Sequence, residues 1–348
     1  MKNERNTVAQ ENVTRTHLDP VVEKPDVMFT VFIPAFNRAY TLDRALQSVA
    51  EQTFRDFEVV IIDDGSTDNT AQLVESWQKK GEFPIRYRWQ ENQGKHVAHN
   101  TAVNLSRGYF FVLLDSDDML HPLALQRLKY HWESIPRSKK EHFAGVEGLC
   151  VYSDSNIKVD RFPEDVMDSD YLEKTKKYNI RSEKRNAIRT DVLRRFPYPC
   201  FEGERHVRDD LIWKRMARHF KFRYVNEVIQ IMEHQADGLT ANIFAMRMRN
   251  PRGFRYYFLE EINDYASLTG TYLRFKYHSK FVRYSLHCKV GFRQQYAEVH
   301  SKFLWLLSVP RGIIGWLEDK IRMTSKFYLP FLERERPIDE NNSSTSSK

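Results

Sequence analysis

The first half of the chain alternates short apolar runs with segments in which apolar residues recur every three or four positions. The apolar runs, which predict strands, are 28–33, 57–62, 85–89 and 109–114. The periodic segments, which predict helices, are 41–51, 70–80 and 96–106. The run at 109–114 is apolar almost throughout, which is typical of a central parallel strand covered on both faces. Strands alternating with helices predict an α/β fold with a mostly parallel central sheet flanked by helices.

The second half of the chain has a less regular pattern. Residues 129–199 are charged and irregular, and we expect edge strands and loops of the same domain there. Residues 209–220 predict an amphipathic helix, and one strand pair or extended segment follows at 222–232. The inward positions predicted for this helix are Leu211, Ile212, Met216 and Ala217. The outward positions predicted for the helix are Lys214, Arg215 and Arg218.

These patterns divide the chain of 348 residues into four parts. Residues 1–26 are polar and predict a disordered leader, and the Ser- and Asn-rich residues 336–348 predict a disordered tail. The α/β domain is expected at 27–240. Aromatic and basic helices are expected at 241–335, as a C-terminal helical extension that is a candidate for membrane or partner contact.

Composition narrows the class of protein only slightly. The three cysteines, Cys150, Cys200 and Cys288, show neither a zinc-site spacing nor a disulfide framework, which favours a reducing cytoplasm. The net charge of +7 indicates an anionic partner: a nucleotide, a nucleic acid or a membrane surface. Lys and Arg are spread without the aromatic platform of an RNA-binding module, so we expect no nucleic acid partner.

Three carboxylates lie within four residues, at Asp115, Asp117 and Asp118, directly after the last apolar run. Carboxylates this dense repel one another unless they hold a cation or one is protonated. They form a natural site for Mg2+ or Mn2+, although an isolated pattern of this kind also suits a solvated turn. Ligands gather at the carboxyl ends of parallel strands. That rule brings four loops to one edge of the sheet: 34–38, 63–66, 91–95 and 115–118.

Five short motifs follow one another along the chain, in these loops or next to them. They are IPAFNR at 33–38, QTFRDFE at 52–58, DDGSTD at 63–68, NQGK at 92–95 and LDSDD at 114–118. With them the chain resembles family 2 glycosyltransferases, which have the Rossmann-like GT-A fold. The resemblance is strong over 28–136 and moderate over 191–240. It identifies the α/β domain as a catalytic domain.

The resemblance implies a nucleotide site and a metal site at this edge. The nucleotide-binding residues are Pro34, Phe36, Arg38, Asp64, Lys95 and Asp115. Asp64 would accept a hydrogen bond from uracil N3–H, and Lys95 would meet the diphosphate at a helix start. Asp117, with Asp115, would bind Mn2+ or Mg2+, and His234 is a further candidate ligand. Asp118 is expected to be structural.

The family also uses a carboxylate base, and Asp209 and Asp210 both qualify. Family members carry a Glu-Asp pair followed by a helix with an Arg. Counting back six residues from Arg215 selects Asp209, whereas the pair itself selects Asp210. An Asp at a helix start is also commonly only a cap. We favour Asp209 and keep Asp210 as the alternative.

The function implied is that of an inverting, metal-dependent glycosyltransferase of the hexosyltransferase type. It would move a sugar from a nucleotide-diphosphate donor, a UDP-sugar, to a hydroxyl of a glycan or lipid-linked acceptor in bacterial-type surface polysaccharide synthesis. One alternative is a sugar nucleotidyltransferase, but the N-terminal region lacks the Gly-rich loop normal for that class. The other is a non-catalytic nucleotide- or nucleic-acid-binding protein.

Residues 303–317 are apolar and aromatic but are interrupted by Pro310 and Arg311. The segment is too short and broken for a membrane-spanning helix of about 20 residues. Basic residues on both sides suit an interfacial helix on an anionic membrane. A helix packed on the catalytic domain would show the same periodicity, so both interpretations stay open. The expected location is the cytoplasm, with peripheral contact at the inner face of the cell membrane.

Overall fold

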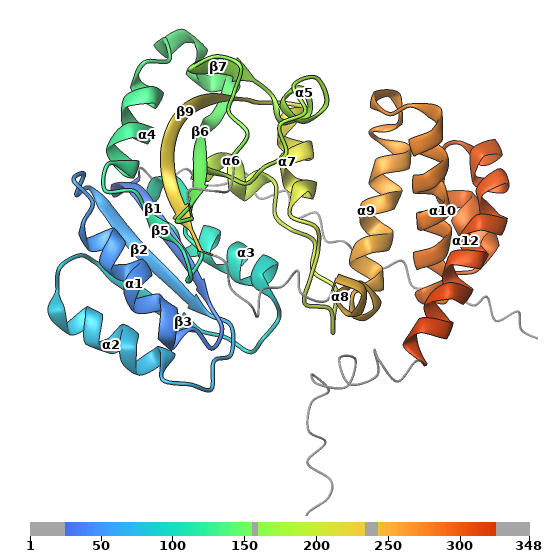
Figure 1. Ribbon diagram of the computed structural model, residues 1–348, viewed down its shortest axis with the longest axis horizontal. Helices are drawn as coiled ribbons and strands as arrows, with labels where there is room; N and C mark the ends of the chain where they lie inside the picture. The colour runs from blue at the N-terminus through green and yellow to red at the C-terminus, as the bar shows by residue number, and fades with distance from the viewer. Residues whose placement is uncertain (1–24, 155–158, 234–242, 325–348) are drawn as a thin grey trace, which may run out of the picture.

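A computed structural model describes residues 25–154, 159–233 and 243–324. A sheet domain is followed by a separate group of helices, drawn at the right of Figure 1. The predicted leader, apart from its last two residues, lies outside the described residues, as do the predicted tail and His234.

The first four strands are parallel and lie in the order β3-β2-β1-β4. They are β1 (Val27–Ala35), β2 (Phe57–Asp63), β3 (Ile85–Trp89) and β4 (Gly108–Leu113). The connecting helices are α1 (Ala39–Ala50), α2 (Thr70–Lys80) and α3 (Lys95–Leu105). All seven predicted elements are confirmed, with ends that agree within two residues.

Side chains alternate between the two faces of this sheet, and each face has its own core. Val31 belongs to the core on the side of α1 and α2, together with Leu42 and Trp77. Its neighbour Phe32 points to the opposite face, where α3 packs with Ala98. Covering both faces explains why β1, β2 and β4 are apolar at nearly every position.

The other half of the sheet mixes directions. Beyond β4 the order is β8 (Lys184–Arg189), β6 (Phe143–Tyr152), β9 (Lys221–Met232) and β5 (Met119–Leu120), and β7 (Val166–Ser169) pairs with β9. β8 is antiparallel to both β4 and β6, whereas β6 and β9 are parallel. The helices are α4 (Ala124–Glu133), η1 (Arg137–His142), α5 (Tyr171–Lys176), α6 (Thr190–Arg195) and α7 (Asp210–Ala217).

The prediction of edge strands in 129–199 is wrong for β6 and β8. Both lie inside the sheet and are buried along most of their length. Their charges misled the prediction because they are paired in the interior. Glu147 of β6, for example, forms an ion pair with Lys174 of α5, and both side chains are 6% exposed. The segment at 222–232 is one long strand, β9.

The helical extension consists of α8 (Ile243–Arg249), α9 (Pro251–Asn263), η3 (Ala266–Leu268), α10 (Thr271–His287), α11 (Phe292–Glu298) and α12 (Lys302–Met323). Helices α9, α10 and α12 lie side by side (Figure 1). Stacked rings of Phe254, Phe258 and Tyr284 join α9 to α10. The expected helices beyond 242 are therefore present.

The apolar segment at 303–317 belongs to α12, which packs against α10 rather than on the sheet. Gly312 permits the close approach, since a Cβ there would lie 2.5 Å from Val282 of α10. The buried carboxylate of Asp319 pairs with Arg283 and His287 of α10. None of the helices in the described ranges has the length and apolar character needed to cross a membrane.

Candidate active site

The structure brings the four predicted loops together at the carboxyl edge of the parallel strands. Asn37, with a positive φ of 52°, donates its main-chain N–H to Ser66 Oγ over 2.8 Å. Its own Oδ1 accepts a hydrogen bond from the Thr67 N–H, also over 2.8 Å. Asn tolerates this left-handed conformation better than most residues. The loops after β1 and β2 are thus fixed to each other.

Asp64, after β2, is 5% exposed and supports the loop that precedes α3. Its carboxylate accepts hydrogen bonds from Gln90 Nε2 over 2.8 Å, from the Gln93 N–H over 3.0 Å and from the Gly94 N–H over 2.7 Å. An ionised carboxylate offers about four acceptor positions, so about one remains for a nucleobase. Asp64 therefore shapes the loop in addition to its predicted contact with the base.

Phe36 and Arg38 lie where β1 gives way to α1. The Phe36 ring is 45% exposed, so its face is accessible to a planar ligand. The Arg38 guanidinium contacts Tyr40, donating to the hydroxyl and lying 5.7 Å from the ring centre. Pro34 is half-buried near the end of β1, opposite Ile62 of β2. These positions agree with a nucleoside lying across the edge of the sheet.

Asp115 is held between two cations, Lys95 and Arg185. Lys95 begins α3 and forms an ion pair with one carboxylate oxygen, while Arg185 of β8 lies 3.2 Å from the other. Burial alone would raise the pKa of Asp115, but the two cations outweigh it and hold that pKa at about 2. The charges of Asp115 and Asp209 likewise outweigh burial and raise the pKa of Lys95.

Asp117 and Asp118 differ in their surroundings. Burial and the charge of Asp115 raise the pKa of Asp117, whose carboxylate has no side-chain partner among the described residues. Asp118 is 6% exposed and accepts from Gln230 Nε2 over 2.6 Å and from the Glu233 N–H over 3.2 Å. Burial and Asp115 raise its pKa to about 7. Its contacts fix the turn to β9.

The donor set at this turn fits a divalent cation. Asp115 and Asp117 supply hard oxygen atoms, and a cation beside them would relieve the repulsion that raises the pKa of Asp117. No group of three metal-ligating side chains occurs within residues 25–154, 159–233 and 243–324. Mg2+ commonly uses one or two carboxylates with substrate phosphates and water, so this small set is sufficient.

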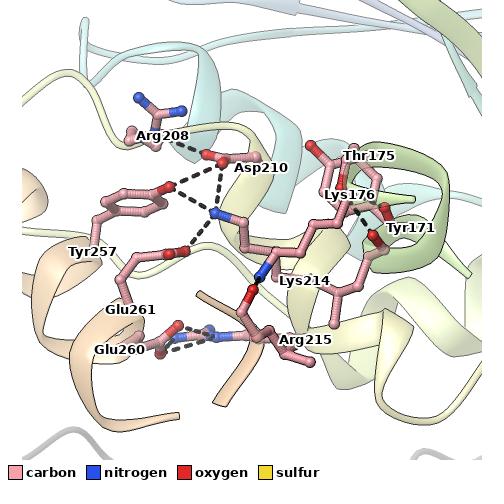
Figure 2. A network of polar contacts seen from close by, with 12 residues as sticks. Tyr171, Thr175, Lys176, Arg208, Asp210, Lys214, Arg215, Tyr257, Glu260 and Glu261 are labelled. Atoms are coloured by element: carbon pink, nitrogen blue, oxygen red, sulfur yellow. Dashed lines mark hydrogen bonds and ion pairs between the residues drawn. The ribbon is translucent and has the colours of Figure 1, made fainter. Parts of the chain in front are cut away.

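The two candidate bases, Asp209 and Asp210, have different partners, which Figure 2 shows for Asp210. Asp210 lies 2.9 Å from Arg208 Nε and 2.8 Å from Lys214 Nζ. Burial alone would raise the pKa of Asp210, but these cations outweigh it and lower that pKa. Asp209 is exposed, and its carboxylate has no hydrogen bond or ion pair with any described residue. Asp209 is thus the candidate whose carboxylate no described side chain holds.

A cavity of about 340 Å³ is lined both by this helix start and by the two cations that hold Asp115. Its lining includes Lys95, Arg185, Asp209, His96, Tyr171 and Trp213. His96 is 5% exposed, and neither ring nitrogen has a hydrogen-bond partner within the described part of the chain. Burial lowers the pKa of His96 to about 4, and the charge of His206 adds to that effect. A neutral imidazole and a neighbouring indole suit a polar ligand with hydroxyl groups.

Comparison with known proteins identifies the domain. Residues 30–138 match the family model described as glycosyl transferase family 2. Chondroitin synthase of Escherichia coli is 34% identical over 135 residues, which are 38% of this chain and 18% of that protein. GalNAc(5)-diNAcBac-PP-undecaprenol beta-1,3-glucosyltransferase of Campylobacter jejuni is 33% identical over 124 residues, 35% of this chain and 38% of that protein.

The fold is also shared with S. aureus TarS, solved as residues 1–349 in complex with UDP-GlcNAc. The TM-score is 0.57 at 18% identity, over 85% of this chain and 92% of that one. The chain carries a family 2 glycosyltransferase domain of the GT-A fold. It spans less than two fifths of either curated relative named above.

Sequence reasoning missed several residues of the candidate site. Arg185 lies in the charged stretch that carried no motif, and only the pairing of β8 with β4 brings it to Asp115. His96 directly follows a predicted site residue, Lys95, and Trp213 lies in the predicted helix after Asp209. Proximity in sequence to a motif was therefore an available signal for His96 and Trp213, and no such signal existed for Arg185.

Proposed function

We propose that this protein is an inverting, metal-dependent glycosyltransferase of the hexosyltransferase type. It transfers a sugar from a nucleotide-diphosphate donor, a UDP-sugar, to a hydroxyl of a glycan or lipid-linked acceptor in surface polysaccharide synthesis. One observation carries the proposal: within a family 2 domain, the exposed Asp209 lines the same cavity as Lys95 and Arg185, the two cations that hold Asp115. A carboxylate base and a charged diphosphate site thus lie on either side of a space for sugar.

The chain's own groups account for the steps of such a transfer. Asp209 accepts the proton of the acceptor hydroxyl, whose oxygen bonds to the anomeric carbon as the bond to the diphosphate oxygen breaks. Lys95, at the N-terminal end of α3, faces the charge that grows on the leaving diphosphate. Asp117, with Asp115, would hold Mn2+ or Mg2+, which acts as a Lewis acid on the same charge.

The nucleoside is expected along the edge formed by Pro34, Phe36, Arg38 and Asp64. Phe36 offers an exposed ring face for the base, and Asp64 retains about one acceptor position for an N–H of that base. Asp115 contacts ribose hydroxyls in addition to its role near the metal. Because these residues would contact the nucleoside, they would favour a nucleotide sugar over a free sugar phosphate as the donor.

A ligand screen followed by a transfer assay tests the proposal. A UDP-sugar that binds the native state should raise the melting temperature in the presence of Mn2+, and UDP-sugars should act more strongly than GDP- or ADP-sugars. The productive donor should release nucleoside diphosphate with each transfer. Release of pyrophosphate from a nucleoside triphosphate and a sugar phosphate would instead support a nucleotidyltransferase. Nucleoside diphosphate release that survives Asp117→Ala would contradict the metal site.

We also infer that α12 contacts an anionic membrane surface at the inner face of the cell membrane, in the cytoplasm. One face of α12 exposes an apolar stripe of Phe303, Leu306, Leu307, Ile314, Leu317 and Ile321, with exposures from 48% to 71%. Between residues 243 and 324 there are 14 Lys and Arg residues against 6 Asp and Glu residues. An apolar stripe in basic surroundings suits anionic lipid, where a lipid-linked acceptor would reside.

Vesicle flotation tests this contact. The protein should float with phosphatidylglycerol vesicles and much less with phosphatidylcholine vesicles, and the double variant Leu307→Asp/Ile314→Asp should lose binding. Tyr130→Asp is the matched control, because Tyr130 is 66% exposed on α4 of the sheet domain. Equal flotation of the α12 variant would contradict membrane contact. Membrane contact would also be contradicted if the wild-type protein formed a dimer in solution and the α12 variant were a monomer.

A further inference from the structure

Helix α7, which begins beside Asp209, has a basic face that is covered by α9 of the helical extension. Lys214 forms an ion pair with Glu261, and Arg215 Nε lies 3.1 Å from Glu260 (Figure 2). Arg218 lies 3.7 Å from Asp264, one turn further along both helices. The prediction that Lys214, Arg215 and Arg218 point outward is therefore wrong for Lys214 and Arg215, since an acidic face of α9 covers them.

Asp210 connects the contacts between α7 and α9 to the candidate site. Its carboxylate contacts Arg208 and Lys214, and it accepts a hydrogen bond from the Tyr257 hydroxyl over 3.1 Å. Lys214 donates to the same hydroxyl over 2.6 Å. The Tyr257 ring also lies 4.5 Å from the Arg208 guanidinium. Tyr257, on α9, thus bridges the residues on both sides of Asp209.

The charges in this network balance. Arg208 and Lys214 contribute two positive charges, and Asp210 and Glu261 contribute two negative ones. Lys214 is 12% exposed and Glu261 is 4% exposed, so removing one partner would leave a poorly solvated charge beside α7. With all four present, Asp210 is held by ion pairs, whereas Asp209 forms no ion pair within 4 Å with a described residue.

The segment before Asp209 is also fixed by the start of α9. Glu204 accepts hydrogen bonds from the Arg252 and Gly253 N–H groups over 2.7 and 2.8 Å. Asn250 Oδ1 accepts from the Arg205 and His206 N–H groups over 2.7 and 2.9 Å. On the other side, Gly94 packs so closely that a Cβ there would lie 1.9 Å from the Arg205 carbonyl oxygen. Residues 204–206 therefore have fixed neighbours on two sides.

We propose that α9 positions the base, and that Tyr257, Lys214 and Glu261 are positioning residues that act on Asp209 through Asp210. The inference rests on the proposed function, in which Asp209 accepts the acceptor proton. The first turn of α7 is fixed by the Lys214–Glu261 ion pair, by the Tyr257 hydroxyl and by the hydrogen bonds that hold residues 204–206. A base displaced by about 1 Å can lose about 100-fold in reaction rate. The helical extension is thus part of the catalytic apparatus.

Three conservative variants test this positioning. Tyr257→Phe removes one hydroxyl, and Glu261→Gln removes one charge. Glu260→Gln is the matched control, because it breaks the Arg215 pair on the same two helices without touching Asp210. We expect kcat to fall about ten-fold in Tyr257→Phe and in Glu261→Gln with donor KM within about two-fold of wild type, and both constants to stay within about two-fold in Glu260→Gln.

Hydrogen exchange provides a second measurement that does not depend on activity. Amides of the first turn of α7 should exchange faster in Tyr257→Phe and Glu261→Gln than in wild type or Glu260→Gln. Unchanged kcat in both variants, an equal loss in Glu260→Gln, or unchanged exchange would each overturn the inference. If wild type transfers no sugar from any donor, the proposed function fails, and the exchange comparison still decides whether α9 fixes α7. Tyr257→Phe keeps the buried charges paired if Glu261→Gln does not fold.

Discussion

The candidate site contains two pairs of carboxylates, Asp115 with Asp117 and Asp210 with Asp209, and the two pairs have similar surroundings. In each pair, two cations hold one member: Lys95 and Arg185 hold Asp115, and Arg208 and Lys214 hold Asp210. The neighbouring Asp117 and Asp209 have no side-chain partner in the described structure. Under the proposed function, the held carboxylates would stabilise the site, and Asp117 and Asp209 would bind the metal and the acceptor proton.

The two pairs differ in where their support originates. Both cations around Asp115 belong to the sheet domain, and Arg185 comes from its strand β8. Lys214, by contrast, is held by Glu261 and Tyr257 of the helical extension. The contacts of Asp115, at the proposed donor end of the site, thus lie within the sheet domain, whereas those of Asp210, beside the proposed base, also involve a second group of helices.

The largest expected effect separates Asp209 from Asp210. Asp209→Asn should lower kcat about 1,000-fold, because it removes the general base and leaves every described side-chain contact intact. Its melting temperature should match that of wild type. Asp210→Asn should retain measurable transfer but unfold at lower temperature, because Arg208 and Lys214 lose a buried partner. Steady-state kinetics and thermal unfolding of both variants decide the matter. Full transfer by Asp209→Asn with none by Asp210→Asn would reverse the assignment.

A second contrast applies to Asp117 and Asp115. Asp117→Asn should abolish the Mn2+-dependent rise in melting temperature with donor, yet leave the apo protein as stable as wild type, since it removes a repulsion. Asp115→Asn should lower the free energy of unfolding by about 3 kcal/mol, because two cations lose their common partner. Urea unfolding without metal, followed by donor titration, measures both. Equal destabilisation by the two variants would remove the distinction between open and held carboxylates.

The sequence predicted the donor end far better than the base end, for a physical reason. Strands β1 to β4 follow one another with short helices between them, so periodicity and loop motifs placed Asp64, Lys95 and Asp115 at one edge. The contacts of Asp210 depend on Tyr257 and Glu261, which lie 47 and 51 residues further on in a region without motifs. The amphipathic pattern of α7 correctly predicted its apolar face. It could not indicate that an acidic helix covers the basic face, since a solvated face has the same pattern.

The smallest expected effect concerns His99, a buried histidine near Lys95. His99 lies one turn beyond Lys95 on α3, is 8% exposed and packs edge-on against Phe111 and Tyr198. Burial lowers the pKa of His99 to about 3, and the charge of Lys95 adds to that effect. The unfolded chain binds this proton below about pH 6.5, but the folded protein does not until near pH 3. The stability that depends on a neutral His99 is therefore full above pH 6.5 and is lost as the pH falls toward 3.

This linkage should reduce the free energy of unfolding by about 2 kcal/mol between pH 7 and pH 5. His99→Phe should make the loss smaller over that interval, because phenylalanine takes up no proton in the unfolded state. His142→Phe is the control, since the His142 side chain is 69% exposed. Urea midpoints at the two pH values measure the effect. The same loss in His99→Phe and wild type would mean that His99 takes up its proton over the same pH range in the folded protein as in the unfolded chain, and that the cations around Asp115 tolerate a further positive charge nearby.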